Sequence, residues 1–215
     1  NIDRSVGAMD NFFSLGGDSI KSIRLVSMLR QKGLSLTVAD VMKGNTVRGI
    51  AALAEMGETI DISQEAVEGE VQPGAIMRYF FNLNLPHAEH YNQSVAFESE
   101  KGNVKKGLLL AALDAVVSHH DMLRMRTEDS RVYINKVGGK MYDFIEEDVQ
   151  TIADIEARAN AIQCTINLKE GPVLKVALFH TLEKDIVVMV CHHLAVDGVS
   201  WRIITEDLNQ AYQMA

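Results

Sequence analysis

The chain has 215 residues, a formal net charge of −8 at pH 7, 47% hydrophobic residues and 23% charged residues. This length is enough for one or two compact domains, and the composition excludes a disordered chain, a collagen and a disulfide-stapled miniprotein. The sequence has no run of about 18 apolar residues, which is the length that a membrane helix needs, and residues 1–20 lack the pattern of a signal peptide. We therefore expect a cytoplasmic protein without a membrane partner.

The charges and cysteines exclude further classes of site. The net charge is acidic and no basic cluster exceeds Lys105-Lys106, which argues against nucleic acid as a partner. Cys164 and Cys191 lie in apolar runs without CxxC spacing. They predict buried free thiols and neither a disulfide nor a metal site.

The distribution of charge divides the chain. Residues 1–57 hold seven basic and five acidic groups, whereas residues 58–70 hold five acidic groups and no basic one. The acidic stretch predicts a solvated linker. We expect a small module over residues 1–57, a linker over 58–70 and a larger module over 71–215.

The small module shows helical spacing. Asp18 predicts the N-cap of a helix from Ser19 to about Lys32, whose apolar face consists of Ile20, Ile23 and Val26 with Leu25 and Leu29. Thr37 predicts the start of a short turn through residue 42, and Thr46 the start of a helix that keeps its apolar face through residue 56. This module is therefore an all-α bundle.

The larger module mixes helices and strands. Helical spacing appears at residues 106–119, at 149–166 and from 200 onward, and strand patterns appear at 131–137, 173–180 and 186–193. The run 186–193 has almost no polar residue before its end, which predicts a central strand buried on both faces. The fold class is therefore mixed, with an all-α bundle followed by an α/β (α+β) domain.

The first candidate site lies at the start of the helix predicted over residues 19–32. Gly16 and Gly17 permit a tight turn, and we expect the hydroxyl of Ser19 to lie outside the bundle. A helix N-terminus offers unpaired N–H groups and a positive dipole end, which would stabilise a phosphodiester on Ser19. The alternative is that Asp18 and Ser19 only cap the helix.

The second candidate site directly follows the predicted buried strand. His192 and His193 point to opposite faces of that strand, so metal chelation by the pair is not expected. A histidine at a strand end can act as a general base near neutral pH. Asp197, beside Gly198, would hold the loop in shape. The alternative is that both histidines are structural.

The third candidate site is the segment 119–126, which contains two histidines and Arg124. Adjacent histidines at a helix end can simply complement the helix dipole. Arg124 cannot lose its charge, which suits a permanent partner of a buried carboxylate. Asp197 is the candidate for that partner.

These motifs resemble those of nonribosomal peptide synthetases. Residues 11–20 (NFFSLGGDSI) resemble the core of a peptidyl carrier protein, in which the serine corresponding to Ser19 bears a 4′-phosphopantetheine arm. Residues 71–215 resemble the N-terminal half of an epimerization domain, a member of the condensation superfamily with a chloramphenicol-acetyltransferase-like fold. The matching segments are HHDMLRMR (119–126), HYNQSVAF (90–97) and, above all, HHLAVDGVSWRIITEDL (192–208).

The resemblance implies a division of roles. The arm on Ser19, with Gly17 and Asp18 beside it, would hold an aminoacyl or peptidyl thioester, and the adjoining domain would epimerize its α-carbon with His193. His192 and Asp197 would support that histidine, and a glutamate of the C-terminal half would be the second proton-transfer group. The implied partners are that half, a phosphopantetheinyl transferase, an adenylation domain upstream and a condensation domain downstream.

Some features depart from the resemblance or leave alternatives open. GAIMRYFF (74–81) stands where the family usually has TPIQxWFF, and Thr127 stands where an aromatic residue is expected. The chain begins after the expected first helix of the carrier and stops before the second half of the epimerization domain, so we expect these 215 residues alone to be inactive. The alternatives are condensation-type acyl transfer with amide bond formation, and a carrier or docking fragment without catalysis.

Overall fold

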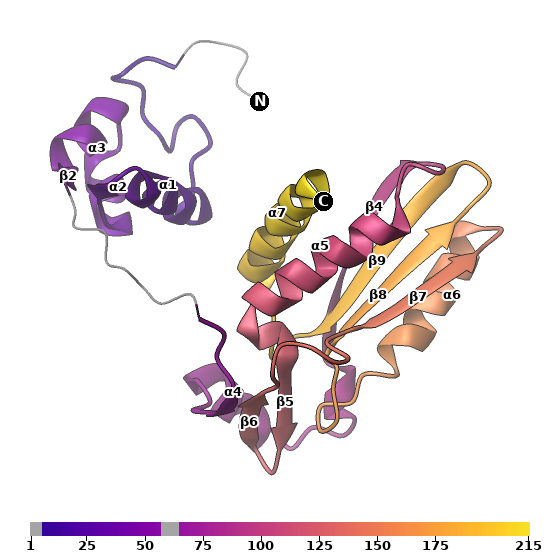
Figure 1. Ribbon diagram of the computed structural model, residues 1–215. Coiled ribbons are helices and arrows are strands. Elements are labelled where there is room, and N and C mark those ends of the chain that lie inside the picture. The colour runs from indigo at the N-terminus through magenta and orange to yellow at the C-terminus, as the bar shows by residue number, and fades with distance from the viewer. Residues whose placement is uncertain (1–5, 57–64) are drawn as a thin grey trace. The chain divides into compact units, whose positions relative to one another are not determined.

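The computed structural model describes residues 6–56 and 65–215 (Figure 1). The chain divides into two compact units, residues 1–63 and residues 64–215. Across the described residues, no helix combines the length and the apolarity needed to span a bilayer.

The first unit is helical, as predicted. It contains α1 (Ser19–Gln31), α2 (Val38–Gly44) and α3 (Val47–Leu53), and a minimal ladder of β1 (Leu34–Ser35) with β2 (Glu55–Met56). The predicted caps are confirmed, because the side chains of Asp18, Thr37 and Thr46 each accept a backbone N–H of the first helical turn. The third helix is shorter than predicted, since β2 takes up the residues after Ala54.

The core of the first unit uses part of the predicted apolar face of α1. Leu25 and Leu29 pack toward the core residues Val41 and Ile50, whereas the side chains of Ile20 and Ile23 are about half exposed. Ser22 lies fully buried on the inward face, where its hydroxyl donates to the carbonyl of Asp18.

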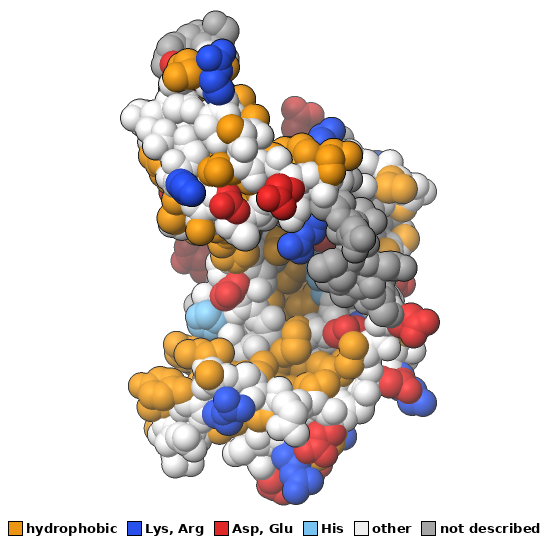
Figure 2. Space-filling view, turned by 90° about the vertical axis from the view of Figure 1, so that its left-hand side faces the viewer, with side chains coloured by type: hydrophobic (Ala, Val, Ile, Leu, Met, Phe, Trp, Pro, Cys, Tyr) orange, Lys and Arg blue, Asp and Glu red, His pale blue; other side chains and the backbone are white. Residues whose placement is uncertain are grey.

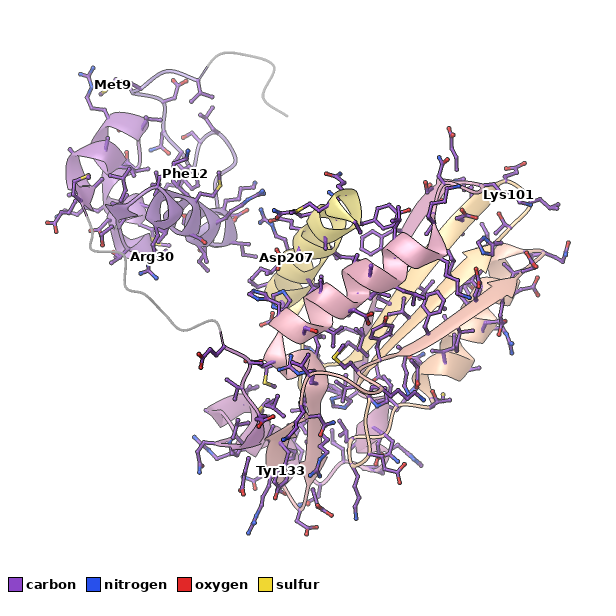
Figure 3. The ribbon with its side chains drawn as sticks, in the orientation of Figure 1. Met9, Phe12, Arg30, Lys101, Tyr133 and Asp207 are labelled. Carbon is purple, nitrogen blue, oxygen red and sulfur yellow. The ribbon has the colours of Figure 1, made fainter. Side chains whose placement is uncertain are left out.

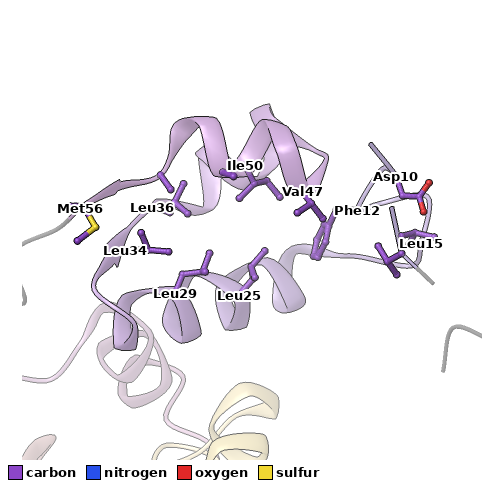
Figure 4. Close-up of a pocket in the computed structure, with 13 residues that line it drawn as sticks. Asp10, Phe12, Leu15, Leu25, Leu29, Leu34, Leu36, Val47, Ile50 and Met56 are labelled. Atoms are coloured by element: carbon purple, nitrogen blue, oxygen red, sulfur yellow. The ribbon is translucent and has the colours of Figure 1, made fainter. Parts of the chain in front are cut away.

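An apolar cavity of about 610 Å³ lies inside the first unit (Figure 4). It opens between α1, which contributes Leu25 and Leu29, and α3, which contributes Val47 and Ile50. Asp10 is the one titratable side chain among its described lining residues, and Ser19 does not line it. The cavity is therefore an extension of the core and not a place for proton chemistry.

The second unit contains two sheets and four α-helices among its described residues. The helices are α4 (Ala75–Asn82), α5 (Lys106–His119), α6 (Ile152–Gln163) and α7 (Gly198–Met214), with short 3₁₀ turns at Ala88–His90 and Asp121–Arg124. The strands are β3 (Gly69–Val71), β4 (Asn92–Glu100), β5 (Met125–Glu128), β6 (Arg131–Ile134), β7 (Asp143–Asp148), β8 (Leu174–His180) and β9 (Lys184–His192).

The larger sheet has the order β4-β9-β8-β7 (Figure 1). The β8–β9 hairpin is antiparallel, and β7 runs parallel to β8, because α6 provides the crossover between them. This confirms the prediction that the apolar run at 186–193 forms a central strand, which begins two residues earlier than expected.

Both faces of this sheet are covered by helices. Val187, Met189 and Cys191 of β9 point into the core shared with α5 and α7, which pack together on one side of the sheet. Val188 and Val190 point into a second core against α6 on the other side. This alternation buries β9 on both faces and leaves its C-terminal end as the point where polar groups begin.

The smaller sheet corrects the predicted linker. Gly69 and Glu70 already belong to β3, which pairs antiparallel with β6, whereas residues 57–64 lie outside the described residues. An exposed edge strand tolerates charged side chains, so an acidic stretch does not exclude pairing.

The sequence also predicted two buried thiols, but only one of them is buried. Cys164 is exposed, whereas Cys191 is buried, and this burial raises the pKa of the Cys191 thiol.

A buried carboxylate at the β8–β9 turn makes stability depend on pH. Asp185 is fully buried, and its Oδ1 lies 2.7 Å from Nδ1 of His180; this pairing, followed by that with Glu146, raises the pKa of His180. Because the pKa of His180 is raised in the folded state, the stabilisation from its pairing with Asp185 is complete below the unfolded-state pKa of about 6.5. This stabilisation is lost as the pH rises through the folded-state pKa of His180.

We expect His180→Gln to lower the free energy of unfolding by about 1–2 kcal/mol at pH 6 and by less at pH 9. Urea unfolding followed by the fluorescence of Trp201, the one tryptophan of the chain and a core residue of this unit, measures both values. His119→Gln, at an exposed helix end, is the matched control. A loss that is equal at the two pH values would contradict the pairing.

Candidate functional site

Ser19 is the first residue of α1, and its side chain is exposed. No hydrogen bond of its hydroxyl is present in the described part of the chain, whereas Asp18 accepts the N–H of Lys21 at 2.8 Å, which lowers the pKa of the Asp18 carboxyl. The hydroxyl thus stands free at the positive end of a 13-residue helix. An acidic group attached there would lie at the positive end of the helix dipole.

Gly17 shapes the approach to this serine. A Cβ at Gly17 would lie 2.4 Å from the ring of Phe12, so no larger residue fits. Gly16 has φ +88°, a conformation that favours glycine. The Gly-Gly pair therefore turns the chain sharply into α1 and leaves the serine side uncovered.

His192 is locked in the structure. Its ring is fully buried, Nε2 donates to the carbonyl of Ala88 at 2.8 Å, and Nδ1 accepts the N–H of Leu194 at 3.1 Å. Desolvation lowers the pKa of this histidine. With both ring nitrogens occupied and charge disfavoured, His192 fixes the strand end and has no free nitrogen for chemistry.

His193 also has a partner at each ring nitrogen, but the partner of its Nε2 is a side-chain amide and not a backbone N–H. Its ring is half-buried and stacks on Tyr91 with centroids 5.3 Å apart. Nδ1 lies 2.7 Å from the carbonyl oxygen of Val196, which can only accept, so Nδ1 carries a hydrogen. In the neutral ring Nε2 is therefore the basic nitrogen, and it lies 3.0 Å from the amide nitrogen of Gln93.

A cavity of about 390 Å³ adjoins His193. Its described lining is mostly apolar: Ile76, Tyr79, Phe80, Leu83, Leu85, Tyr91, His193, Leu194, Ala195, Val196, Asp197 and Ser200. Two α4 side chains of this lining, Ile76 and Tyr79, are exposed, and Figure 2 shows hydrophobic side chains gathered low in the view at this end of the unit. A single basic nitrogen at an apolar cavity is an arrangement suited to proton transfer.

Asp197 caps α7. Its Oδ1 accepts the N–H groups of Val199 and Ser200 at 3.0 and 2.8 Å, and it also accepts the hydroxyl of Ser200 at 2.8 Å. The bonds to Ser200 lower the pKa of Asp197. The carboxylate therefore holds the loop between His193 and α7 in place, as predicted, and does so through backbone N–H groups.

The predicted pairing of Asp197 with Arg124 is wrong. The guanidinium of Arg124 is buried and donates to the carbonyls of Val117 and Ser118 at 2.7 Å and to Asp121 Oδ1 at 2.6 Å. It also reaches the carbonyls of Val67 and Asn135. Asp197 is exposed and needs no buried cation, whereas the end of α5 leaves carbonyls that do need donors.

The histidines at 119–120 form no part of this arrangement. His120 Nε2 lies 2.7 Å from Oδ2 of Asp207, which Figure 3 labels on α7, so this pair ties α5 to α7. His119 is exposed and meets the ring of His120 edge-on. In the described part of the chain, no group of three or more His, Cys, Asp or Glu could hold a metal ion.

Sequence reasoning did not single out Gln93 and Tyr91 as site residues. Both lie where β4 begins beside the end of β9, where the N–H of His193 bonds to the carbonyl of Tyr91 at 2.9 Å. The available signal was the segment HYNQSVAF, whose polar start precedes an apolar strand. Only the strand register shows that this segment lies beside His193.

Comparison with protein families and curated proteins gives consistent matches. Residues 64–215 match the condensation domain, and residues 2–54 match the phosphopantetheine attachment site. The chain is 38% identical to surfactin synthase subunit 2 of Bacillus subtilis (strain 168) over 98% of its length, and 36% identical to tyrocidine synthase 1 of Brevibacillus parabrevis over 98%. It spans 6% and 20% of those two proteins.

Solved structures give the same picture. The epimerization domain from the third module of tyrocidine synthetase B is similar with a TM-score of 0.67 and 35% identity, over 71% of this chain and 36% of that one. A starter condensation domain of rhizomide synthetase is similar with a TM-score of 0.54 and 21% identity, over 67% of this chain and 36% of that one. The latter likeness concerns the fold alone.

The separate environments of Arg124 and Asp197 predict additive effects. We expect Asp197→Ala to cost about 1 kcal/mol through loss of the cap, and Arg124→Met to cost about 3 kcal/mol through loss of buried carbonyl partners. The double variant should lose the sum within about 0.5 kcal/mol in Trp201-monitored urea unfolding. A coupling energy well above that value would contradict this result and indicate that Arg124 and Asp197 form an ion pair. The variant Asp197→Asn should recover most of the stability that the cap provides.

Proposed function

The chain belongs to the condensation-domain family and carries a phosphopantetheine attachment site; from this premise we propose that its second unit is part of an epimerization domain acting on an acyl group carried by the first. The observation that carries the proposal is the ring of His193, locked at Nδ1 and basic at Nε2, beside an apolar cavity. The two units would then be a carrier and a catalytic lobe of a nonribosomal peptide synthetase.

In this proposal Ser19 carries the 4′-phosphopantetheine arm. The fit rests on its free, exposed hydroxyl at the helix start and on the sharp Gly16-Gly17 turn. The arm, when attached, presents an acyl group as a thioester, which makes the α-proton acidic. A phosphopantetheinyl transferase would attach it, and adenylation and condensation domains would supply and consume the acyl group.

His193 would move the α-proton. Nε2 would accept the proton from the α-carbon in place of the hydrogen bond that the Gln93 amide donates to it at rest, while Nδ1–H keeps its bond to the Val196 carbonyl and holds the ring in one orientation. The stack on Tyr91 limits rotation of the ring. Return of a proton to the opposite face of the carbon gives the mirror-image centre, with no net change of atoms.

A second proton-transfer group must serve that opposite face. Asp197 is engaged as the cap of α7, and His192 has both nitrogens bonded. The remaining titratable side chains among the described lining residues are Tyr79 and Tyr91. We therefore assign the second group to the C-terminal half of the epimerization domain.

Condensation-type acyl transfer is the second candidate. The family match favours it, because that match is to the condensation domain as a whole. The higher identity of 35% and TM-score of 0.67 with an epimerization domain support epimerization instead. Formation of an amide would identify condensation. Deuterium uptake at the α-carbon without amide formation would identify epimerization.

We predict that a phosphopantetheinyl transferase with coenzyme A adds one phosphopantetheinyl group to this chain at Ser19. The free hydroxyl at the helix start is the physical reason. Intact-mass analysis detects the gain, with Ser19→Ala as the control and Ser14→Ala, also exposed on the preceding loop, as the matched variant that keeps it. An equal gain in Ser19→Ala would exclude this serine as the attachment point.

We predict that His193→Ala, in the intact synthetase, lowers α-proton exchange about a hundredfold or more, because the basic nitrogen is lost. His192→Ala should act mainly by destabilising the fold, since that ring is buried and hydrogen-bonded at both nitrogens. Deuterium incorporation into the thioester, measured beside an unfolding curve, separates the two effects. Retained exchange in folded His193→Ala would move the base elsewhere.

A further inference from the structure

The side chain of Gln93 is the one hydrogen-bond partner of the basic nitrogen of His193 among the described residues. Its amide nitrogen lies 3.0 Å from His193 Nε2, and its Oε1 is buried without a hydrogen-bond partner in the described part of the chain. We infer that Gln93 is a positioning residue whose amide turns over as His193 gains and loses its proton. This inference rests on the proposed function, since it assigns His193 the proton transfer.

The resting state follows from the Val196 carbonyl. Because Nδ1 of His193 carries the hydrogen, Nε2 presents a lone pair, and only the NH₂ end of Gln93 can pair with it. The opposite amide orientation would set two acceptors against each other. The amide oxygen is therefore turned away and left without a donor.

The protonated state reverses this requirement. An imidazolium ring donates at both nitrogens, and Nδ1–H already has the Val196 carbonyl as its acceptor. Nε2–H would then face the NH₂ group of Gln93, donor against donor. A half-turn of the terminal amide brings Oε1 to Nε2, so the oxygen that has no partner at rest gains one.

A neutral partner suits a base that must give its proton back. A carboxylate at this position would hold the ring in its charged form, whereas an amide offers one hydrogen bond to each form. The other titratable groups around the ring are Tyr91, which stacks on it, the adjacent His192, and Asp197, which is held by α7. Substitution of Gln93 leaves all three in place.

The first test uses nuclear magnetic resonance of the 215-residue chain with labelled histidine, and needs no substrate. The ring nitrogen shifts of His193 report its tautomer and its protonated fraction. We expect the ratio of protonated to neutral ring at neutral pH to rise about tenfold in Gln93→Glu and to fall several-fold in Gln93→Met, which keeps the volume without the amide. Ser94→Ala, exposed on the same strand, should leave the ratio unchanged.

An equal protonated fraction in wild type, Gln93→Glu and Gln93→Met would overturn the inference, as would a wild-type ring with its hydrogen on Nε2. Trp201 fluorescence establishes that each variant is folded. The second test follows α-proton exchange in the intact synthetase, where the rising limb of the pH profile should move to higher pH in Gln93→Glu and to lower pH in Gln93→Met. Unmoved profiles would also overturn the inference.

The two tests separate the inference from its premise. If His193→Ala retains exchange, the proposed function fails, and Gln93 then has no catalytic ring to position. If His193→Ala abolishes exchange while the Gln93 variants change neither the ring nor the pH profile, the function stands and the role of Gln93 fails.

Discussion

The burial of β9 on both faces determines where the chemistry of the second unit can occur. Its side chains fill two separate cores, so a slip by one residue would move each side chain into the other core, where it would not fit its neighbours. His192 is the last residue of this strand, and His193 directly follows it. Their positions are therefore fixed by the sheet and not by the loop that follows.

The loop divides its work between neighbouring residues. His192 bonds backward to the 3₁₀ turn at Ala88 and forward to Leu194, and Asp197 bonds forward to the first turn of α7. Between these two anchors, His193 lines the cavity, and the only hydrogen-bond partner of its basic nitrogen among the described residues is the side chain of Gln93. Because His192 and Asp197 hold the strand end and the loop, the ring of His193 can gain a proton without loosening the strand end.

Much of this arrangement was predictable from sequence, because it depends on local patterns. The helix starts at Ser19 and Lys106 and the central strand follow from capping residues and periodicity, and the family motifs indicate Ser19 and His193. The roles assigned to these two residues remain proposals. The pairing of Arg124 was not predictable, because its partners are backbone carbonyls that the helix end leaves open. Gln93 was missed for a related reason, since only the register of β4 against β9 places it beside the ring.

The two proposed functional residues meet opposite physical demands. A serine that several enzymes must reach has to stand on an exposed surface, and Ser19 does so at a helix start where the backbone, not a side-chain network, supplies the favourable field. A histidine that removes a weakly acidic proton has to be oriented and partly shielded from water, and His193 obtains this from the Val196 carbonyl, the Tyr91 ring and the Gln93 amide. One surface cannot satisfy both demands, which gives a physical reason for housing them in separately folded units of one chain.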